Sequence, residues 1–365
     1  MTTSGTASSR GLYATYGGTI TASGVTISTM WKSCATLSTD RGGGTVSCTG
    51  CTLSTMDSGS PFIYSGGTTS IITVSGTTGR QSASQCVVVE GKNTAIVQDR
   101  SNLKCTGKGN TGDADNSGIF LYQSMSGDAD VGTTTFTCTN SKFEIDSYSS
   151  IYDSVPIFSI TNTAAAINLE NCTFKYGSKK FLSATTNSEG WGTSGSNGGN
   201  VTLTLTNQDI EGDFIIDSCS SLTIKMINSS IIGAINTWNT STNVAVILDA
   251  DSSLNLTGDS YISSYTNEDT TGSNINKGSY IFADNYGNDW ITTESSTSAS
   301  TTTVSTITVS TTTFSTTSNN SENPISNYDK SLYILLGKTI AIATVAFMLL
   351  LLLFLLKNFI KSIFE

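Results

Sequence analysis

Histidine is missing from this sequence of 365 residues, and charged residues are scarce. Without histidine, Ser-His-Asp and Cys-His catalysis, histidine-ligated zinc and imidazole acid–base chemistry are excluded. Charged residues make up 13% of the chain, against a usual share of about 25%. The 18 basic residues are spread thinly over a chain whose net charge is −10. No cluster able to neutralise phosphates is visible, which argues against a nucleic-acid partner.

Proline is also rare, with three residues against 34 glycines, and one short unit recurs along the chain. The unit has an alternating apolar pair, a turn residue two places on, and an apolar residue three places later, as in INLENCTF at 167–174. The turn residue is always Gly, Asn or Asp, the types that best tolerate a left-handed backbone. The turn positions are Gly24, Gly50, Gly76, Asn102, Asn140, Asn171, Asn207, Asn228 and Asp251.

Each copy predicts a strand, a sharp bend and a second strand with an apolar inner face. Successive turn positions lie 21 to 38 residues apart, and three consecutive intervals are 26 residues long. A period of this length built from short strands indicates a solenoid, while the leucine-rich consensus is missing and a β-propeller blade needs about 40 residues. The sequence therefore predicts an all-β fold, a parallel β-helix of about eleven coils over 1–292, whose longer intervals form projecting loops.

The repeat breaks at three places. Gln98 and Arg100 replace the apolar pair before Asn102, and Asp249 replaces one member of the pair before Asp251. Gly79 leaves a gap after Gly76, where the other coils have an apolar side chain.

The C-terminal part has a different composition. Residues 293–330 are dominated by Ser and Thr, which predicts a disordered stalk. Residues 331–357 include 18 uncharged residues from Thr339 to Leu356, which predicts one transmembrane helix. Lys357 and Lys361 favour a cytoplasmic tail at 358–365, a single-pass topology and a β-helix at the cell surface. The N-terminus lacks the apolar segment of a secretory signal, and we expect a truncation inside the repeat array.

The eight cysteines are either buried core residues or disulfide partners, and the sequence does not assign a pairing. Cys48 and Cys51 form a CxxC without the further ligands of a zinc site. Two acidic loops, GDADNSG at 112–118 and GDADV at 127–131, resemble the first half of a calcium loop. Calcium is thus the one candidate cofactor, with solvated Asp-Gly turns as the alternative. The candidate ligands are Asp113, Asp115, Asp128 and Asp130.

Aromatic residues in loops are the candidate ligand-binding residues. Trp191 lies among glycines in SEGWGTSGSNGG at 188–199, where its ring can stack on a sugar or fold back as a cap on the coils. Glu189 and Asn197 could hydrogen-bond sugar hydroxyls around it. Trp238 and Tyr122 are weaker candidates of the same kind.

Six segments in order resemble a family of bacterial surface proteins with a right-handed, pectate-lyase-like β-helix. They are VVVEGKNTAIVQDRSNLKCTG, IFLYQSMSGDADVG, FSITNTAAAINLENCTF, WGTSGSNGGNVTLTL, GAIN and GDSYISSY, within residues 86 to 266. Proteins of this family are described as adhesin-like or carbohydrate-binding. The resemblance implies the right-handed fold and an exterior location, and it transfers no catalytic residue. The Ser/Thr stalk and terminal helix depart from the bacterial arrangement.

The leading functional hypothesis is a membrane-anchored adhesin-like protein whose loops bind an extracellular polysaccharide or a neighbouring cell surface. One alternative is a polysaccharide lyase or glycoside hydrolase, which needs carboxylates or basic residues aligned across coils. The sequence shows no such alignment. The other alternative is a structural protein that self-associates through rows of threonine.

Overall fold

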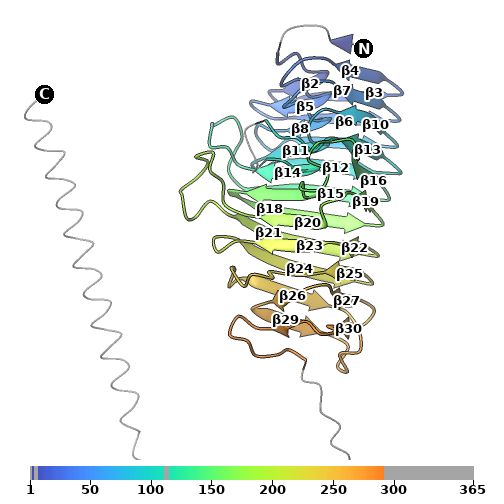
Figure 1. Ribbon diagram of the computed structural model, residues 1–365. Coiled ribbons are helices and arrows are strands. Elements are labelled where there is room, and N and C mark those ends of the chain that lie inside the picture. Colours follow the sequence, from blue (N-terminus) through green and yellow to red (C-terminus); the bar gives the residue numbers. More distant parts are fainter. Residues whose placement is uncertain (1, 4–6, 111–114, 292–365) are drawn as a thin grey trace, which may run out of the picture. The chain divides into compact units, whose positions relative to one another are not determined.

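Strands three places apart in the chain pair with each other through most of the molecule, so the chain winds repeatedly through the same faces (Figure 1). The structure, a computed structural model, describes residues 2–3, 7–110 and 115–291. In this part of the chain the regular elements are strands, and the named strands pair in parallel. An all-β solenoid of stacked parallel coils is therefore confirmed.

Most strands belong to three sheets. Sheet I comprises β2 (Leu12–Thr15), β5 (Leu37–Asp40), β8 (Ile63–Ser65), β11 (Val87–Glu90), β14 (Ile119–Tyr122), β17 (Phe158–Thr161), β20 (Lys180–Ala184) and β23 (Asp213–Ile216). Sheet II has ten strands, which are β3 (Gly18–Ser23), β6 (Gly44–Thr49), β9 (Ile71–Ser75), β12 (Thr94–Gln98), β15 (Thr133–Thr139), β18 (Thr163–Glu170), β21 (Gly199–Thr206), β24 (Ser221–Ile227), β26 (Val244–Leu248) and β29 (Ser264–Asn267).

Sheet III and two smaller sheets hold the remaining strands. Sheet III comprises β1 (Thr2–Thr3), β4 (Thr26–Thr29), β7 (Thr52–Thr55), β10 (Thr78–Ser82), β13 (Asn102–Cys105), β16 (Lys142–Ile145) and β19 (Thr173–Lys175). A four-stranded sheet contains β22 (Asp209–Glu211), β25 (Ser230–Gly233), β27 (Ser253–Leu256) and β30 (Ile275–Asn276), and β28 (Ser260–Tyr261) pairs with β31 (Phe282–Ala283).

A left-handed residue turns the chain from sheet II into sheet III and, at Asn207 and Asn228, from sheet II into the four-stranded sheet. Of the predicted turn positions, Asn102 and Asp251 are not left-handed. The others have φ between 45° and 64°, and they are Gly24, Gly50, Gly76, Asn140, Asn171, Asn207 and Asn228. The N–H of the corner residue donates to the neighbouring coil, as Gly24 does to the carbonyl of Thr49 at 2.9 Å. The bend therefore costs no hydrogen bond of the ladder between coils.

The coil of β12 and β13 has one additional corner residue. Asp99 and Arg100 are both left-handed there, with φ of 56° and 65°, and Asn102 is already the first residue of β13. The predicted break in this coil is therefore wrong, because the apolar pair precedes Asp99 and Arg100 and not Asn102. Its apolar pair is Ala95 and Val97, both at 0% exposure.

At several corners the following residue is a Ser or Thr whose hydroxyl accepts a backbone N–H of the neighbouring coil. The N–H of Thr77 donates to Ser101 Oγ at 3.1 Å, and the N–H of Gln208 donates to Ser229 Oγ at 3.1 Å. The N–H of Ser229 in turn donates to Ser252 Oγ at 3.1 Å. These side chains are buried, and an unsatisfied buried N–H would be costly. Small polar residues at this position therefore maintain the stack.

The interior is a continuous apolar core. Phenylalanine rings contact one another from coil to coil at centroid distances of 5.3 to 5.9 Å, through Phe136, Phe143, Phe158, Phe174, Phe181 and Phe214. The gap expected at Gly79 is filled by another ring, because a Cβ on Gly79 would lie 2.5 Å from a ring carbon of Phe62. Each such buried side chain stabilises the fold by roughly 1.5–3 kcal/mol.

Cysteines occur both as disulfide partners and as core thiols. Cys48–Cys51 spans one corner, and Cys138–Cys172 joins two adjacent coils. The described cysteines outside these bridges are Cys34, Cys86 and Cys105, which are buried, and Cys219, which is partly exposed. Disulfides of this kind persist in oxidising compartments.

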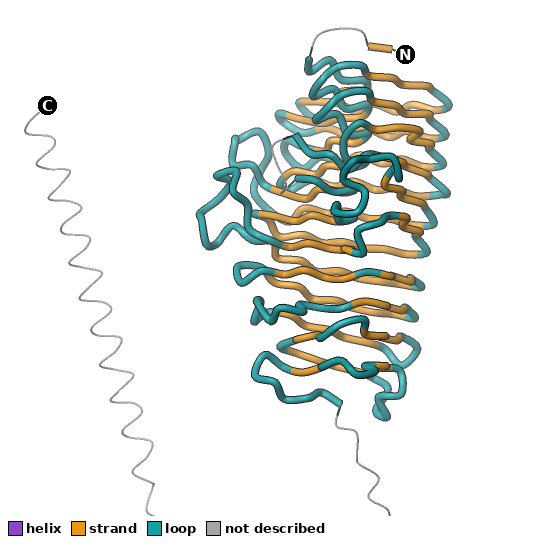
Figure 2. Tube along the Cα trace, in the orientation of Figure 1, coloured by secondary structure: helices purple, strands orange, loops and turns teal. Residues whose placement is uncertain are grey.

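The longer intervals form loops, as predicted, and the main ones are 123–132, 146–157 and 185–198, together with the described residues 106–110 and 115–118 (Figure 2). The predicted stalk at 293–330, the helix at 331–357 and the tail at 358–365 lie outside the described residues. Among the residues that the structure does describe, no helix has the length and apolarity to cross a membrane.

The corner geometry makes a prediction for Asn171, whose φ is 51°. Replacing Asn171 with Val should destabilise the protein by ~1–3 kcal/mol, because a β-branched residue is strained in the left-handed region. Thermal unfolding followed by circular dichroism should show a lower melting temperature.

Asn168→Val is the matched control, because Asn168 lies on the exposed face of strand β18, where a β-branched residue fits. It should melt like the wild type. Equal melting of both variants would contradict the left-handed corner.

Candidate functional site

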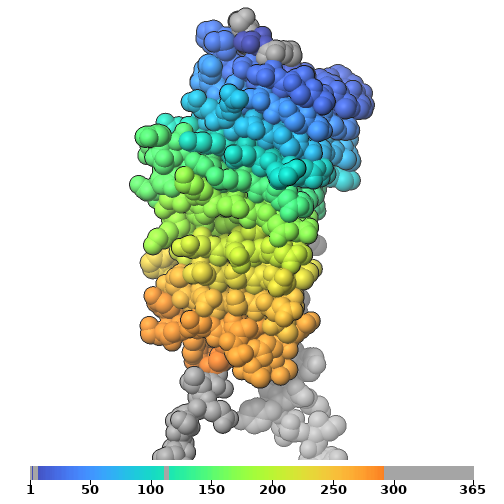
Figure 3. Space-filling model, turned by 90° about the vertical axis from the view of Figure 1, so that its right-hand side faces the viewer, coloured from blue at the N-terminus to red at the C-terminus, as the bar shows by residue number. Residues whose placement is uncertain are grey.

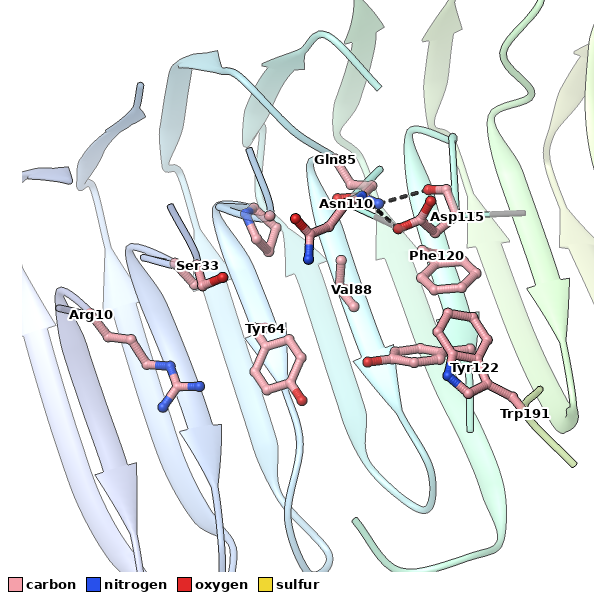
Figure 4. Close-up of a pocket in the computed structure, with 13 residues that line it drawn as sticks. Arg10, Ser33, Tyr64, Gln85, Val88, Asn110, Asp115, Phe120, Tyr122 and Trp191 are labelled. Carbon is pink, nitrogen blue, oxygen red and sulfur yellow. Dashed lines mark hydrogen bonds between the residues drawn. The ribbon is translucent and has the colours of Figure 1, made fainter. Parts of the chain in front are cut away.

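A groove of about 210 Å³ runs over the outer face of sheet I. The register of this sheet sets Tyr64 of β8 beside Val88 of β11 and Val88 beside Phe120 of β14. Figure 4 shows these side chains along the strands, with Phe120 close to Trp191 at one end and Arg10 at the other. We call this the sheet I groove. The chain from Arg10 to Trp191 includes seven strands of sheet I, and stacking brings the two ends of this stretch onto one surface.

Loops cover the outer face of sheet I at its middle strands. All four residues of β11 are buried, including Val88 and Glu90, which point away from the core. Outward side chains are buried only if other segments lie over them. Asn110 and Asp115 line the groove, and loop 185–198 contributes Trp191.

Three aromatic rings form the apolar end of the groove. Phe120 and Tyr122 stack with their centroids 4.5 Å apart. Trp191 lies 5.0 Å from Tyr122 and 6.0 Å from Phe120, at tilted angles. Its backbone is held by the loop itself, because Asn187 Oδ1 accepts from the N–H of Trp191 at 3.2 Å and Asn197 Nδ2 donates to its carbonyl at 3.0 Å. The loop thus presents the indole in a defined position.

Glu90 is a buried carboxylate beneath the aromatic rings, with an exposure of 2%. Its Oε2 accepts from the hydroxyls of Tyr64 at 2.6 Å and Tyr122 at 3.1 Å. Its Oε1 accepts from the N–H of Ser124 at 3.3 Å and from the Ser124 hydroxyl. Burial, Tyr122 and Glu90 raise the pKa of Tyr64 well above its ordinary value of 10.0. Burial and Glu90 do the same to the pKa of Tyr122.

Arg10 forms the cationic end of the groove. Its guanidinium lies 3.2 Å from Asp40 and over the rings of Tyr13 and Tyr64, at 4.8 and 5.8 Å from their centroids. The ion pair and the cation–π contacts fix the side chain in place.

The structure brings together two of the sequence-predicted binding residues, Trp191 and Tyr122. Asn197 is buried and orders the Trp191 loop, and Glu189 lies on the same loop. Trp238 is 84% exposed and is not among the residues that line the groove. Trp191 packs against Phe120 and Tyr122 of β14 and also lines the groove.

Sequence reasoning missed Arg10, Tyr64, Glu90 and Phe120. They lie in short strands or beside them, and only the pairing of distant coils shows that they share a face. The signal available was the spacing of 26 residues between Tyr64 and Glu90, which places them in successive coils.

The proposed calcium residues are spread over different surroundings. Asp113 lies outside the described residues, and Asp115 Oδ2 accepts from the N–H of Asn110 at 2.6 Å. Asp128 pairs with Arg41 at 3.5 Å, and Asp130 accepts from Thr68 at 3.4 Å. Within residues 2–3, 7–110 and 115–291 no group of three or more His, Cys, Asp or Glu residues could hold a metal ion.

Comparison with known proteins finds no matching family model, no matching curated protein and no matching solved structure.

The tyrosines around Glu90 predict a pH dependence. Because the folded-state pKa values of Tyr64 and Tyr122 are raised, their contribution to stability is fully present below pH 10 and is lost as the pH rises through the folded-state values. The melting temperature should therefore fall above about pH 10.

Glu90→Gln should let these tyrosines ionise at lower pH, because the neighbouring negative charge is removed. Ultraviolet absorbance of tyrosinate in the folded protein measures the shift. Glu170→Gln, at an exposed position of β18, is the control and should titrate like the wild type. Identical curves for Glu90→Gln and the wild type would contradict the contact.

Proposed function

We propose that this protein is a membrane-anchored, adhesin-like surface protein that binds a glycan in the sheet I groove. The aromatic end formed by Phe120, Tyr122 and Trp191 is the observation that favours this function most. Sugar rings present apolar C–H faces that pack on aromatic side chains, and their hydroxyls need polar partners at the edge. The groove supplies such partners in Arg10, Asn110 and Asp115.

Binding fits the groove better than hydrolysis or lyase chemistry does. Asp40 is paired with Arg10, both oxygens of Glu90 accept hydrogen bonds, and Asp115 accepts the N–H of Asn110. Carboxylates that already accept hydrogen bonds or ion pairs from Arg10, Tyr64, Ser124 and Asn110 hold those residues in place. A general acid or base instead needs a free path to the substrate.

The location is part of the same proposal. Disulfides, a Ser/Thr-rich segment at 293–330 and the apolar segment at 331–357 together favour an exterior head on a stalk and a single membrane helix. We take the coils to wind in the right-handed, pectate-lyase-like sense, which parallel crossovers almost always adopt. The partner is then an extracellular polysaccharide or the glycans of another cell.

Self-association is the second candidate, and the outer face of sheet II favours it. In strands β3, β6, β9, β12 and β15 the outward rows contain no charged side chain and consist mainly of Thr and Ser. Their members are Thr19, Thr21, Ser23, Thr45, Ser47, Thr49, Ile71, Thr73, Ser75, Thr94, Ile96, Gln98, Thr133, Thr135, Thr137 and Thr139. An uncharged face on an acidic protein avoids like-charge repulsion between copies.

Trp191→Ala is expected to abolish glycan binding and to leave the circular dichroism and melting temperature unchanged, because Trp191 packs on the outside of sheet I. A glycan array and pull-down with insoluble polysaccharides, run on the unit Met1–Ser295 with calcium and with chelator, measure this. Trp238→Ala is the matched control at an exposed tryptophan away from the groove and should bind normally.

Equal binding by wild type and Trp191→Ala would remove the groove from consideration. A much earlier melting of Trp191→Ala would mean that the ring is a structural cap. Assembly that rises with concentration in the absence of any glycan would favour self-association instead.

A further inference from the structure

Sheet III gathers basic side chains that lie far apart in the sequence. Asn102 of β13 is in register with Lys142 of β16, and Lys104 with Glu144. Glu144 is in turn beside Lys175 of β19. Arg80 lies on β10, next to β13, and Arg100 lies at the corner before β13. We call the five side chains Arg80, Arg100, Lys104, Lys142 and Lys175 the cationic stripe. Figure 3 views the molecule from the side on which β13, β16 and β19 lie in Figure 1.

Three lysines of the stripe converge on one carboxylate. Glu144 lies 3.7 Å from Lys104 Nζ, 3.2 Å from Lys142 Nζ and 3.4 Å from Lys175 Nζ. Lys104 also pairs with Asp146 at 3.2 Å. Burial alone would raise the pKa of Glu144, but the hydrogen bonds from Lys142 and Lys175 lower it. Three lysines thus surround Glu144 and Asp146 on a chain whose net charge is −10.

The stripe is open to a large partner. Lys142 is 42% and Lys175 55% exposed, and exposed ion pairs of this kind contribute little to stability. Beside the corners, a hollow of about 360 Å³ is lined by Arg100, Lys142 and the polar residues between them. Anions from outside can therefore replace or join Glu144 without disrupting the core.

The geometry favours a chain of regularly spaced anions. Strands lie about 4.8 Å apart, so Lys104 and Lys175, two strands apart, are based about 9.6 Å from each other. Strands β7, β10, β13, β16 and β19 pair in register, and their outward side chains form two rows. These rows contain no aromatic side chain on which a base could stack. A polymer recognised by charge alone fits this face better than a single-stranded nucleic acid does.

We propose that the cationic stripe of sheet III binds an anionic polysaccharide, one bearing carboxylates or sulfates at regular intervals. This face is separate from the sheet I groove, so the proposal does not depend on that function. Glu144 acts as an internal anion that holds the three ammonium groups together and competes with the polymer. Its removal should therefore strengthen binding, whereas removal of the lysines should weaken it.

The experiment uses the full chain in a mild detergent and measures binding to heparin and to oligogalacturonate, with neutral dextran as the reference. The wild type should bind both polyanions, more weakly as salt rises, and not bind dextran through this face. The triple variant Lys104→Gln, Lys142→Gln and Lys175→Gln should lose roughly tenfold in affinity. Glu144→Gln should bind roughly two- to fivefold more tightly.

The matched control is the triple variant Lys32→Gln, Lys92→Gln and Lys225→Gln, which changes the net charge equally at exposed positions off sheet III. It should bind like the wild type, and Trp191→Ala should keep its polyanion binding. Equal weakening by both triple variants would overturn the proposal, since only the overall charge would then matter. Weaker binding by Glu144→Gln would overturn it too, as would capture by anionic lipid vesicles without any binding to the polysaccharides.

Discussion

The left-handed corner that follows a strand of sheet II is the constraint on which the molecule depends. A left-handed residue such as Asn140 or Gly50 bends the chain sharply between two strands. Its N–H still donates to a carbonyl of the neighbouring coil. Strands that leave the corner at the same point stack in the same register. The small polar residue after it, such as Thr77 or Ser229, then finds its partner one coil away.

Constant register makes each face of the stack a set of continuous rows. Rows that point inward build the core, and rows that point outward give each sheet its own chemistry. Sheet I is covered by loops and is aromatic, sheet II is uncharged over its first five strands, and sheet III bears the cationic stripe. Loops can lengthen without disturbing the rows, because the strand on each side returns to the same register. Loop 185–198 lengthens its coil in this way and brings Trp191 over β14.

The sequence was sufficient for the architecture because the repeat is local. Period-two apolar residues and a Gly or Asn two places on predict the same strand–corner–strand unit wherever they occur, and the corner at Asn171 is as predicted. The error at Asn102 arose where a coil has two left-handed residues, and spacing alone does not show which residue pairs with which coil. The contact of Phe62 with Gly79 was missed because it crosses the core. Phe62 directly precedes β8 of sheet I, whereas Gly79 lies in β10 of sheet III.

The candidate site was predictable only in part. Trp191 was accessible to sequence reasoning, because a large aromatic side chain in a glycine-rich loop has no core to fill, whereas Tyr122 is the last residue of strand β14. Arg10, Tyr64 and Glu90 meet only through the stacking of coils, and so do the lysines around Glu144. A sequence that seems to scatter its charges thinly can therefore hold a cationic face, since residues many positions apart become neighbours.

The central claim is that a sugar ring binds over sheet I. Its most direct test is a crystal structure of the unit Met1–Ser295 with the oligosaccharide that binds best. The account predicts electron density for a sugar ring in van der Waals contact with Trp191 and Tyr122. A sugar bound at Trp238 or on another face, with the sheet I groove occupied by solvent alone, would contradict it.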